Sequence, residues 1–103
     1  MTTPALPPAV VTYGWCRSSY TVVRSLAARG VTVHVADSSR FAMSRFSRYA
    51  ASFNRLPDFY TEPVAYIDAL GEAVGRRGAR VLLPGFEDIE LIMRHRARLP
   101  VTV

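Results

Sequence analysis

The sequence AVVTYGWCRSSYTVVRSLAARG, residues 9–30, decides the fold. It begins with a short apolar run rich in valine, passes through a polar turn, and continues at helical spacing to a glycine. Such an apolar run, bounded by proline and glycine, is typical of a parallel strand covered on both faces. Ser18 and Ser19 stand where a helix N-cap belongs, and Gly30 fits the left-handed residue that ends a helix.

The residues that follow at once, VTVHVA at 31–36, have the character of a second strand. A strand, a helix and a strand in about thirty residues form a βαβ unit. We therefore expect a right-handed crossover and two parallel strands.

The rest of the chain alternates in the same way. We expect one or two helical turns at 41–48, strands around 52–55, at 80–84 and from 101–103, and helices at 61–77 and 87–98. The spacing predicts that each later helix buries one apolar stripe, formed by Val64, Ile67, Leu70 and Val74 in the first and by Ile89, Ile92 and Met93 in the second. Gly71 and Gly75 indicate close packing, and Gly78 ends the first of these helices.

This alternation predicts a three-layer α/β/α domain around a mostly parallel, Rossmann-like sheet of 4–5 strands. One domain covers residues 9–103, after a disordered lead-in at residues 1–8. The 103 residues are 50% hydrophobic, which suits a single core. No run is long and apolar enough for a membrane helix, and the one cysteine, Cys16, is compatible with a reducing cytoplasm, where we expect the protein.

The net charge is +5, and all 13 basic residues are arginines. They are spread along the chain from Arg17 to Arg98 instead of forming a block. We therefore read them as a solvated surface and do not expect a nucleic-acid partner.

Ligands of parallel sheets bind beyond the carboxyl ends of the strands, where the loops 14–19, 37–40 and 84–87 are expected. Helix amides with Arg17, Ser18 and Ser19 suit a carboxylate or a phosphate. Asp37 either binds a ribose or caps its own loop. Glu87 either binds an amine or stabilises a helix start.

Two better-known kinds of site are not predicted. Only Gly14 is present where a dinucleotide site has three glycines. Cys16 has no histidine near it in the sequence, and His34 and His95 stand alone, so we expect no catalytic group and no metal site.

Three segments together resemble the N-terminal domain of ATP-grasp carboxylate–amine ligases, most closely the carbamoyl-phosphate-synthase-like members. They are YGWCRSSYTVVRSLAARGVTVHVAD, SRFAMSRFSRYAASFNRLPDF and VLLPGFEDIELIMRHRARLP. The resemblance implies a pre-ATP-grasp domain that packs against an ATP-grasp module. With ATP and magnesium, that module activates a carboxylate as an acyl phosphate, which an amine then attacks.

The resemblance also implies roles for single residues. Gly14, Arg17 and Ser18, together with Ser19 from the same loop, are expected to touch a small carboxylate or amine substrate or the neighbouring module. Asp37 and Glu87 share this expectation. The module needs about 200 further residues and the lysines that hold ATP phosphates, and this segment contains no lysine. We therefore expect this segment alone to bind no cofactor and to be inactive.

Two alternatives remain open. The chain is either a stand-alone Rossmann-like module that binds a nucleotide or an anion, or an assembly domain whose exposed sheet edge at 101–103 pairs with another chain. A short parallel sheet leaves apolar surface uncovered, so we also expect a homodimer.

Overall fold

The structure is a computed structural model that describes residues 6–12, 17–38, 48–58, 60–85, 88–99 and 101, and of Arg17 and Ser18 the backbone alone. Its elements, in chain order, are β1 (Ala9–Thr12), α1 (Arg17–Ala28), β2 (Val33–Asp37), β3 (Ala50–Arg55), α2 (Pro63–Arg77), β4 (Val81–Leu83), α3 (Ile89–Arg94) and the 3₁₀ helix η2 (Arg96–Arg98). The helical turns expected at 41–48 lie outside the described residues, apart from their last residue.

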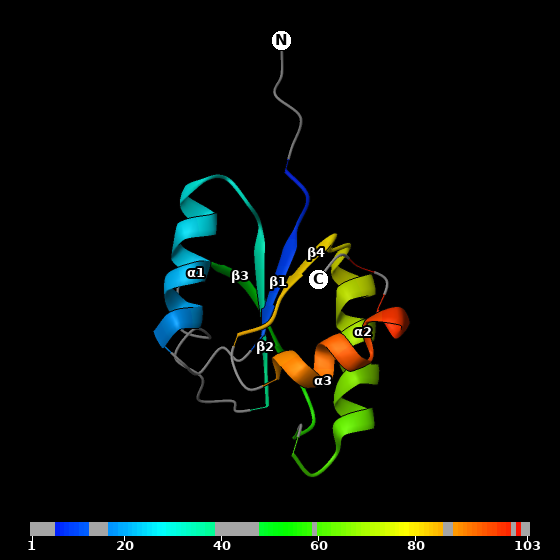
Figure 1. Ribbon diagram of the computed structural model, residues 1–103. Coiled ribbons are helices and arrows are strands. Elements are labelled where there is room, and N and C mark those ends of the chain that lie inside the picture. The colour runs from blue at the N-terminus through cyan, green and yellow to red at the C-terminus, as the bar shows by residue number, and fades with distance from the viewer. Residues whose placement is uncertain are drawn as a thin grey trace.

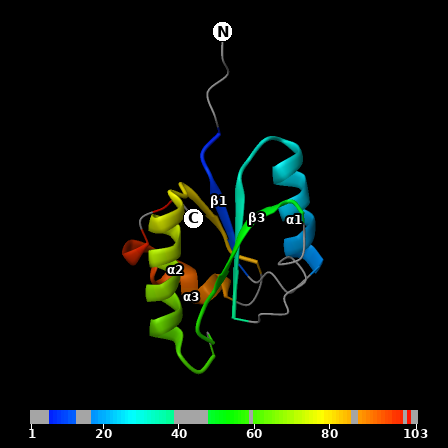
Figure 2. The ribbon, with the colours of Figure 1, turned by 180° about the vertical axis from the view of Figure 1, so that it is seen from behind.

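The four strands form one sheet in the order β3-β2-β1-β4, and every neighbouring pair is parallel. Helix α1 covers one face of the sheet, and α2 and α3 cover the other, as the front and back views show (Figures 1 and 2). The predicted Rossmann-like α/β/α architecture is therefore confirmed. The chain runs outward from β1 to β3 and then crosses to β4, so the topological switch point lies between β1 and β4.

Both faces of the central strands are buried, which explains their nearly continuous apolar sequence. All residues of β1 and β2 are buried. Val10 packs with Leu82 and the apolar face of α2. Val11 and Val35 pack on the other face with Val23 of α1. Each of these two apolar clusters fills the space between one face of the sheet and the helices that cover that face.

The glycine predicted to end each long helix does so. Gly30 has a φ of 84°, and its N–H bonds to the Ala27 carbonyl at 3.0 Å, while Val31 N–H bonds to the Leu26 carbonyl at 3.1 Å. This pair of bonds is a Schellman motif. Gly78, with a φ of 64°, ends α2 with the same pattern of bonds.

The start of α1 differs from the prediction. The helix begins at Arg17, so Ser18 and Ser19 lie inside its first turn instead of in front of it. The side chain of Ser19 is 1% exposed and faces β1. Ser19 therefore does not cap the helix. Its buried hydroxyl needs a hydrogen-bond partner, and it donates to the Thr12 carbonyl at the end of β1.

The predicted stripe of α2 is correct for Ile67, Leu70 and Val74, but Val64 is 52% exposed. Tyr66 and Ala73 are buried in its place. The buried stripe is centred on Leu70, and at about 100° per residue Val64 lies about 120° from that line.

The last predicted helix is broken. It consists of α3 and then η2, with His95 between them. Of the three residues expected inward, only Ile92 is buried, whereas Ile89 and Met93 are 48% and 40% exposed. In this short helix Ile92 is the buried residue, and its neighbour Leu91 packs against the core while half-buried.

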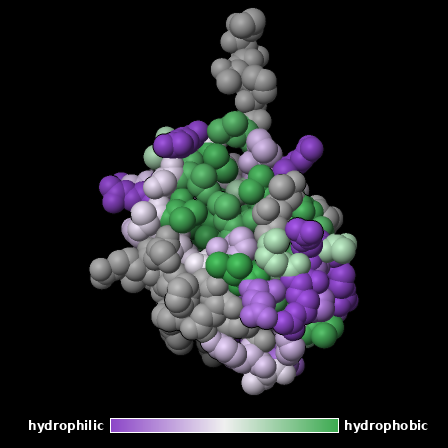
Figure 3. Space-filling view, in the orientation of Figure 1, coloured by the Kyte–Doolittle hydropathy of each residue, from purple (hydrophilic) through white to green (hydrophobic). Residues whose placement is uncertain are grey.

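The β4 edge of the sheet is apolar and only partly covered. Val81 and Leu83 are half-buried on either side of the buried Leu82. Figure 3 shows apolar side chains gathered over β4 and the adjoining part of the sheet, between the two layers of helices. Val101 lies at a bend and packs against the core, and the remaining two residues of the predicted fifth strand are outside the described part.

The predicted lead-in reaches the sheet at its last residue, because the Pro8 carbonyl accepts a hydrogen bond from Arg80 N–H at 3.0 Å. Among the described residues, no helix has the length and apolar character needed to cross a bilayer.

Candidate functional site

The carboxyl ends of the strands lie together at the lower edge of the sheet in Figure 1. Thr12 is the last residue of β1, the strand between β2 and β4. Thr12 is fully buried. Its Oγ1 accepts a hydrogen bond from Gly85 N–H at 3.0 Å, and its carbonyl accepts one from the Ser19 hydroxyl at 3.0 Å. One residue thus joins the end of β1 to α1 and to the segment that follows β4, across the switch point.

Asp37 ends β2 on the same edge and is 5% exposed. Its Oδ1 accepts a hydrogen bond from Ser38 N–H at 2.6 Å, and the Ser38 hydroxyl donates to the Pro57 carbonyl at 2.9 Å. These bonds are those of a loop cap, one of the two roles that the sequence allows for Asp37. The other role, contact with a ligand, belongs to the proposed function below.

Tyr66 and Asp88 form a fully buried polar pair at this edge. Tyr66 is 1% exposed and Asp88 0%, and the phenol hydroxyl donates to Asp88 Oδ2 at 2.8 Å. Burial raises the pKa of Tyr66, and the negative charges of Asp88 and then Asp37 raise it further, against a smaller lowering by a hydrogen bond with Thr12. The phenol therefore stays protonated and remains a donor.

We call Thr12, Asp37, Tyr66 and Asp88 the rim cluster. Its members come from β1, β2, α2 and the residue that precedes α3. All four side chains are at most 5% exposed, and the bonds described above tie them to one another and to the backbone, so the cluster fixes the carboxyl edge from within. Within the part of the chain that the structure describes, no group of three potential metal ligands comes together.

An open pocket of about 590 Å³ lies beside the rim cluster, beyond the carboxyl ends of β2 and β3. It is lined by Ser38, Arg55, Leu56, Pro57, Asp58 and Glu62. Asp58 shapes its wall, because the carboxylate Oδ1 accepts hydrogen bonds from the N–H groups of Tyr60 at 2.8 Å and Thr61 at 3.2 Å. Because Ser38 and Arg55 stand at the carboxyl ends of β2 and β3, the pocket lies at the edge where parallel sheets bind their ligands.

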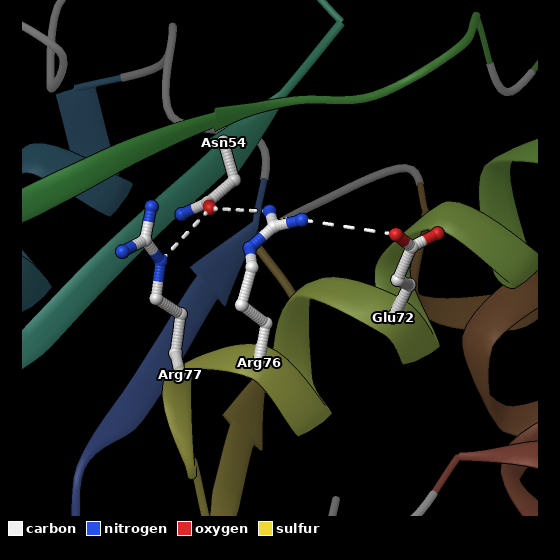
Figure 4. Close-up of polar contacts among 4 residues, drawn as sticks. All are labelled: Asn54, Glu72, Arg76 and Arg77. Carbon is white, nitrogen blue, oxygen red and sulfur yellow. Dashed lines mark hydrogen bonds and ion pairs between the residues drawn. The ribbon is translucent and has the colours of Figure 1, made fainter.

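A second polar network, on the face of the sheet covered by α2, fixes the end of that helix (Figure 4). Asn54 of β3 is 4% exposed, and its Oδ1 accepts hydrogen bonds from Arg76 Nη2 at 3.2 Å and Arg77 Nε at 3.1 Å. Its amide nitrogen donates to the Val35 carbonyl and to Ser52 Oγ. Asn54 is satisfied on both sides, so we assign this network a structural role.

His34 belongs to the same network through a 2.7 Å hydrogen bond between its Nδ1 and Ser52 Oγ. Burial lowers the pKa of His34, and the charge of Arg77 lowers it further. The imidazole is therefore neutral near pH 7.

The structure brings only part of the predicted site together. The ends of β1, β2 and β4 meet at one edge, with Ser19 and Asp37 beside it. Gly14 and Glu87 lie outside the described residues, and for Arg17 and Ser18 the structure gives only their place in the first turn of α1.

Thr12, Tyr66 and Asp88 were not among the site residues predicted from the sequence. A signal for Tyr66 is present in the sequence. It follows the same helical stripe as Ile67 and Leu70, and a phenol on a buried stripe needs a hydrogen-bond partner. The sequence does not single out Asp88 as that partner, since Glu62, Asp68 and Glu72 are all closer to Tyr66 along the chain.

No family model matches the chain, and a search of curated proteins gives no match either. The class that can be stated is therefore that of the fold, a Rossmann-like α/β/α domain with a polar carboxyl edge.

Proposed function

We propose that the chain is the N-terminal, substrate-side domain of an ATP-grasp carboxylate–amine ligase of the carbamoyl-phosphate-synthase-like kind. In this proposal the domain does not catalyse the reaction alone. It lines one side of the substrate site and packs against the ATP-grasp module, which holds ATP and magnesium. We place this ligase in the cytoplasm.

The observation that carries the proposal is the strand order β3-β2-β1-β4, with the rim cluster at the switch point. Where the order of strands in a parallel sheet reverses, as it does between β1 and β4, the adjoining loops run to opposite faces, and ligands of such sheets bind in the crevice between those loops. The resemblance of three segments to the pre-ATP-grasp domain supports the choice of a ligase among the many functions of such sheets, because the fold alone does not select a function.

The contacts proposed for substrate or module are Gly14, Arg17, Ser18 and Ser19 on the first loop, with Asp37 and Glu87 on the other two. Within the described residues, Asp37 supports this assignment by its place at the carboxyl end of β2. The chain has no lysine to hold ATP phosphates, so we assign nucleotide binding to the partner module.

Calorimetric titration of the 103-residue protein tests the proposal. We expect no saturable heat with magnesium ATP or with NAD, and we expect the reading frame to continue into a module that contains lysines. Micromolar binding of either nucleotide would favour a stand-alone module instead. Binding of DNA with a steep dependence on salt would contradict both functions.

An assembly domain is the second candidate, and the β4 edge favours it. Half-buried Val81 and Leu83 flank Leu82 on a strand at the end of the sheet, beneath the apolar surface seen in Figure 3. Exposed edge strands pair readily with other chains. Light scattering at high protein concentration should show a homodimer, and a monomer throughout would count against this candidate.

A further inference from the structure

Arg55 and Glu62 line the same pocket and carry opposite charges. Arg55 is the last residue of β3, and Glu62 is the N-cap residue of α2. Both are exposed. Their positions are set by two rigid elements and by the short turn between them, which the Asp58 carboxylate closes with bonds to Tyr60 and Thr61.

The two charges do not neutralise each other. Among the described residues, no ion pair joins Arg55 to Glu62, and the side chain of neither residue makes a hydrogen bond or an ion pair elsewhere. Other exposed charges of this protein do form pairs. Arg98 binds Asp68 at 2.6 Å, although 30 residues separate them in the sequence.

The open pocket therefore presents one cation, Arg55, and the carboxylates of Glu62 and Asp58 to the same space. The Asp58 carboxylate already accepts hydrogen bonds from two backbone N–H groups of the turn, which leaves Glu62 as the carboxylate without a partner among the described residues. A guanidinium binds a carboxylate through two parallel hydrogen bonds, and a carboxylate binds an ammonium group. Leu56 and Pro57 add apolar lining to the same space. Its volume of about 590 Å³ is within the range of small-molecule sites.

We propose that this pocket binds a zwitterionic α-amino acid with an aliphatic side chain. The ligand's carboxylate lies on Arg55, its ammonium group on Glu62, and its side chain against Pro57. The site is beyond β2 and β3 and is separate from the switch point between β1 and β4. It requires only the pocket, so it stands or falls independently of the proposed ligase function.

Nuclear magnetic resonance with L-leucine tests the proposal. The ¹⁵N-labelled 103-residue protein is titrated with L-leucine and with its two single-charge analogues, 4-methylpentanoate and 3-methylbutylamine. We expect saturable amide shifts at Ser38, Arg55 and Glu62 with leucine. Binding of each analogue should be at least about tenfold weaker, since each loses one charge-assisted contact.

Matched variants locate the site. Arg55→Gln and Glu62→Gln should each weaken leucine binding about tenfold or more, and Arg29→Gln, an exposed charge at the far end of α1, should not change it. The amide spectrum of each variant shows directly that it is folded. No saturable shift with leucine, analogues that bind as tightly as leucine, or equal affinity in all three variants would overturn the proposal. None of these outcomes bears on the ATP titration that tests the ligase function.

Discussion

The Tyr66 hydroxyl donates a hydrogen bond to Asp88 Oδ2 at 2.8 Å, and neither residue is more than 1% exposed. This bond joins the buried face of α2 to the residue that precedes α3, at the carboxyl edge of the sheet. It fixes two of the four members of the rim cluster with respect to each other.

Removal of the Tyr66 hydroxyl should destabilise the fold. The variant Tyr66→Phe leaves the buried Asp88 carboxylate without this donor, which costs about 1–3 kcal/mol of unfolding free energy. Urea unfolding measures the change. Tyr60→Phe is the matched control, because Tyr60 is 67% exposed and its change should stay within about 0.5 kcal/mol. Equal effects of the two variants would contradict the importance of the bond.

Alkaline pH should unfold the protein through Tyr66. Burial and the Asp88 charge raise the pKa of the folded phenol. Its contribution is therefore complete below the unfolded pKa of about 10 and falls above it by up to about 1.4 kcal/mol per pH unit. The chain has no lysine, so the other side chains that titrate in this range are the four remaining tyrosines and Cys16. Unfolding free energies at pH 9 and pH 11 should diverge less for Tyr66→Phe than for the natural sequence. Parallel curves would exclude Tyr66 as the cause.

Acid should weaken the fold through His34. Burial and the charge of Arg77 lower the pKa of the folded imidazole below 6.5. The folded state therefore binds fewer protons than the unfolded state, so this contribution is complete above pH 6.5 and is lost as the pH falls through the folded pKa. The slope of unfolding free energy against pH in this range should be smaller for His34→Gln, while His95→Gln should keep it. An unchanged slope in His34→Gln would refute the assignment.

Two glycines near the end of α2 should respond in opposite directions to alanine. Gly78 has a φ of 64°, so Gly78→Ala should cost about 1–2 kcal/mol. A Cβ at Gly75 meets nothing within 4 Å, so Gly75→Ala should gain about 0.5–1 kcal/mol through helix propensity. Thermal unfolding measures both. A loss of stability in Gly75→Ala would mean that this helix face is closely packed.

The glycines also show what sequence can and cannot predict. Gly30 and Gly78 were identifiable as helix ends because only glycine adopts that backbone without strain. Close packing was expected at both Gly71 and Gly75, but only Gly71 faces a neighbour, with Leu99 Cδ2 3.5 Å from its added Cβ. For Gly75 the prediction is wrong, because contact between distant elements depends on the angle at which a helix lies on the sheet.

The candidate site shows the same contrast between features that local sequence determines and contacts between distant elements. The strands and their parallel order follow from local apolar runs and from the handedness of crossovers, so the carboxyl edge was predictable. The bond between Tyr66 and Asp88 joins residues 22 positions apart on two helices. The pocket charges Arg55 and Glu62 come from a strand end and a helix cap. No local pattern reports such pairs, since they arise only when α2 settles on the sheet.

The measurement that tests the central proposal most directly is ADP release by the protein made from the complete reading frame that contains this chain. With magnesium ATP, a carboxylate and an amine, we predict ADP release that requires both substrates, and none from the 103 residues alone. ADP release that ignores both substrates, or none from the complete protein with any carboxylate and amine pair, would contradict a ligase.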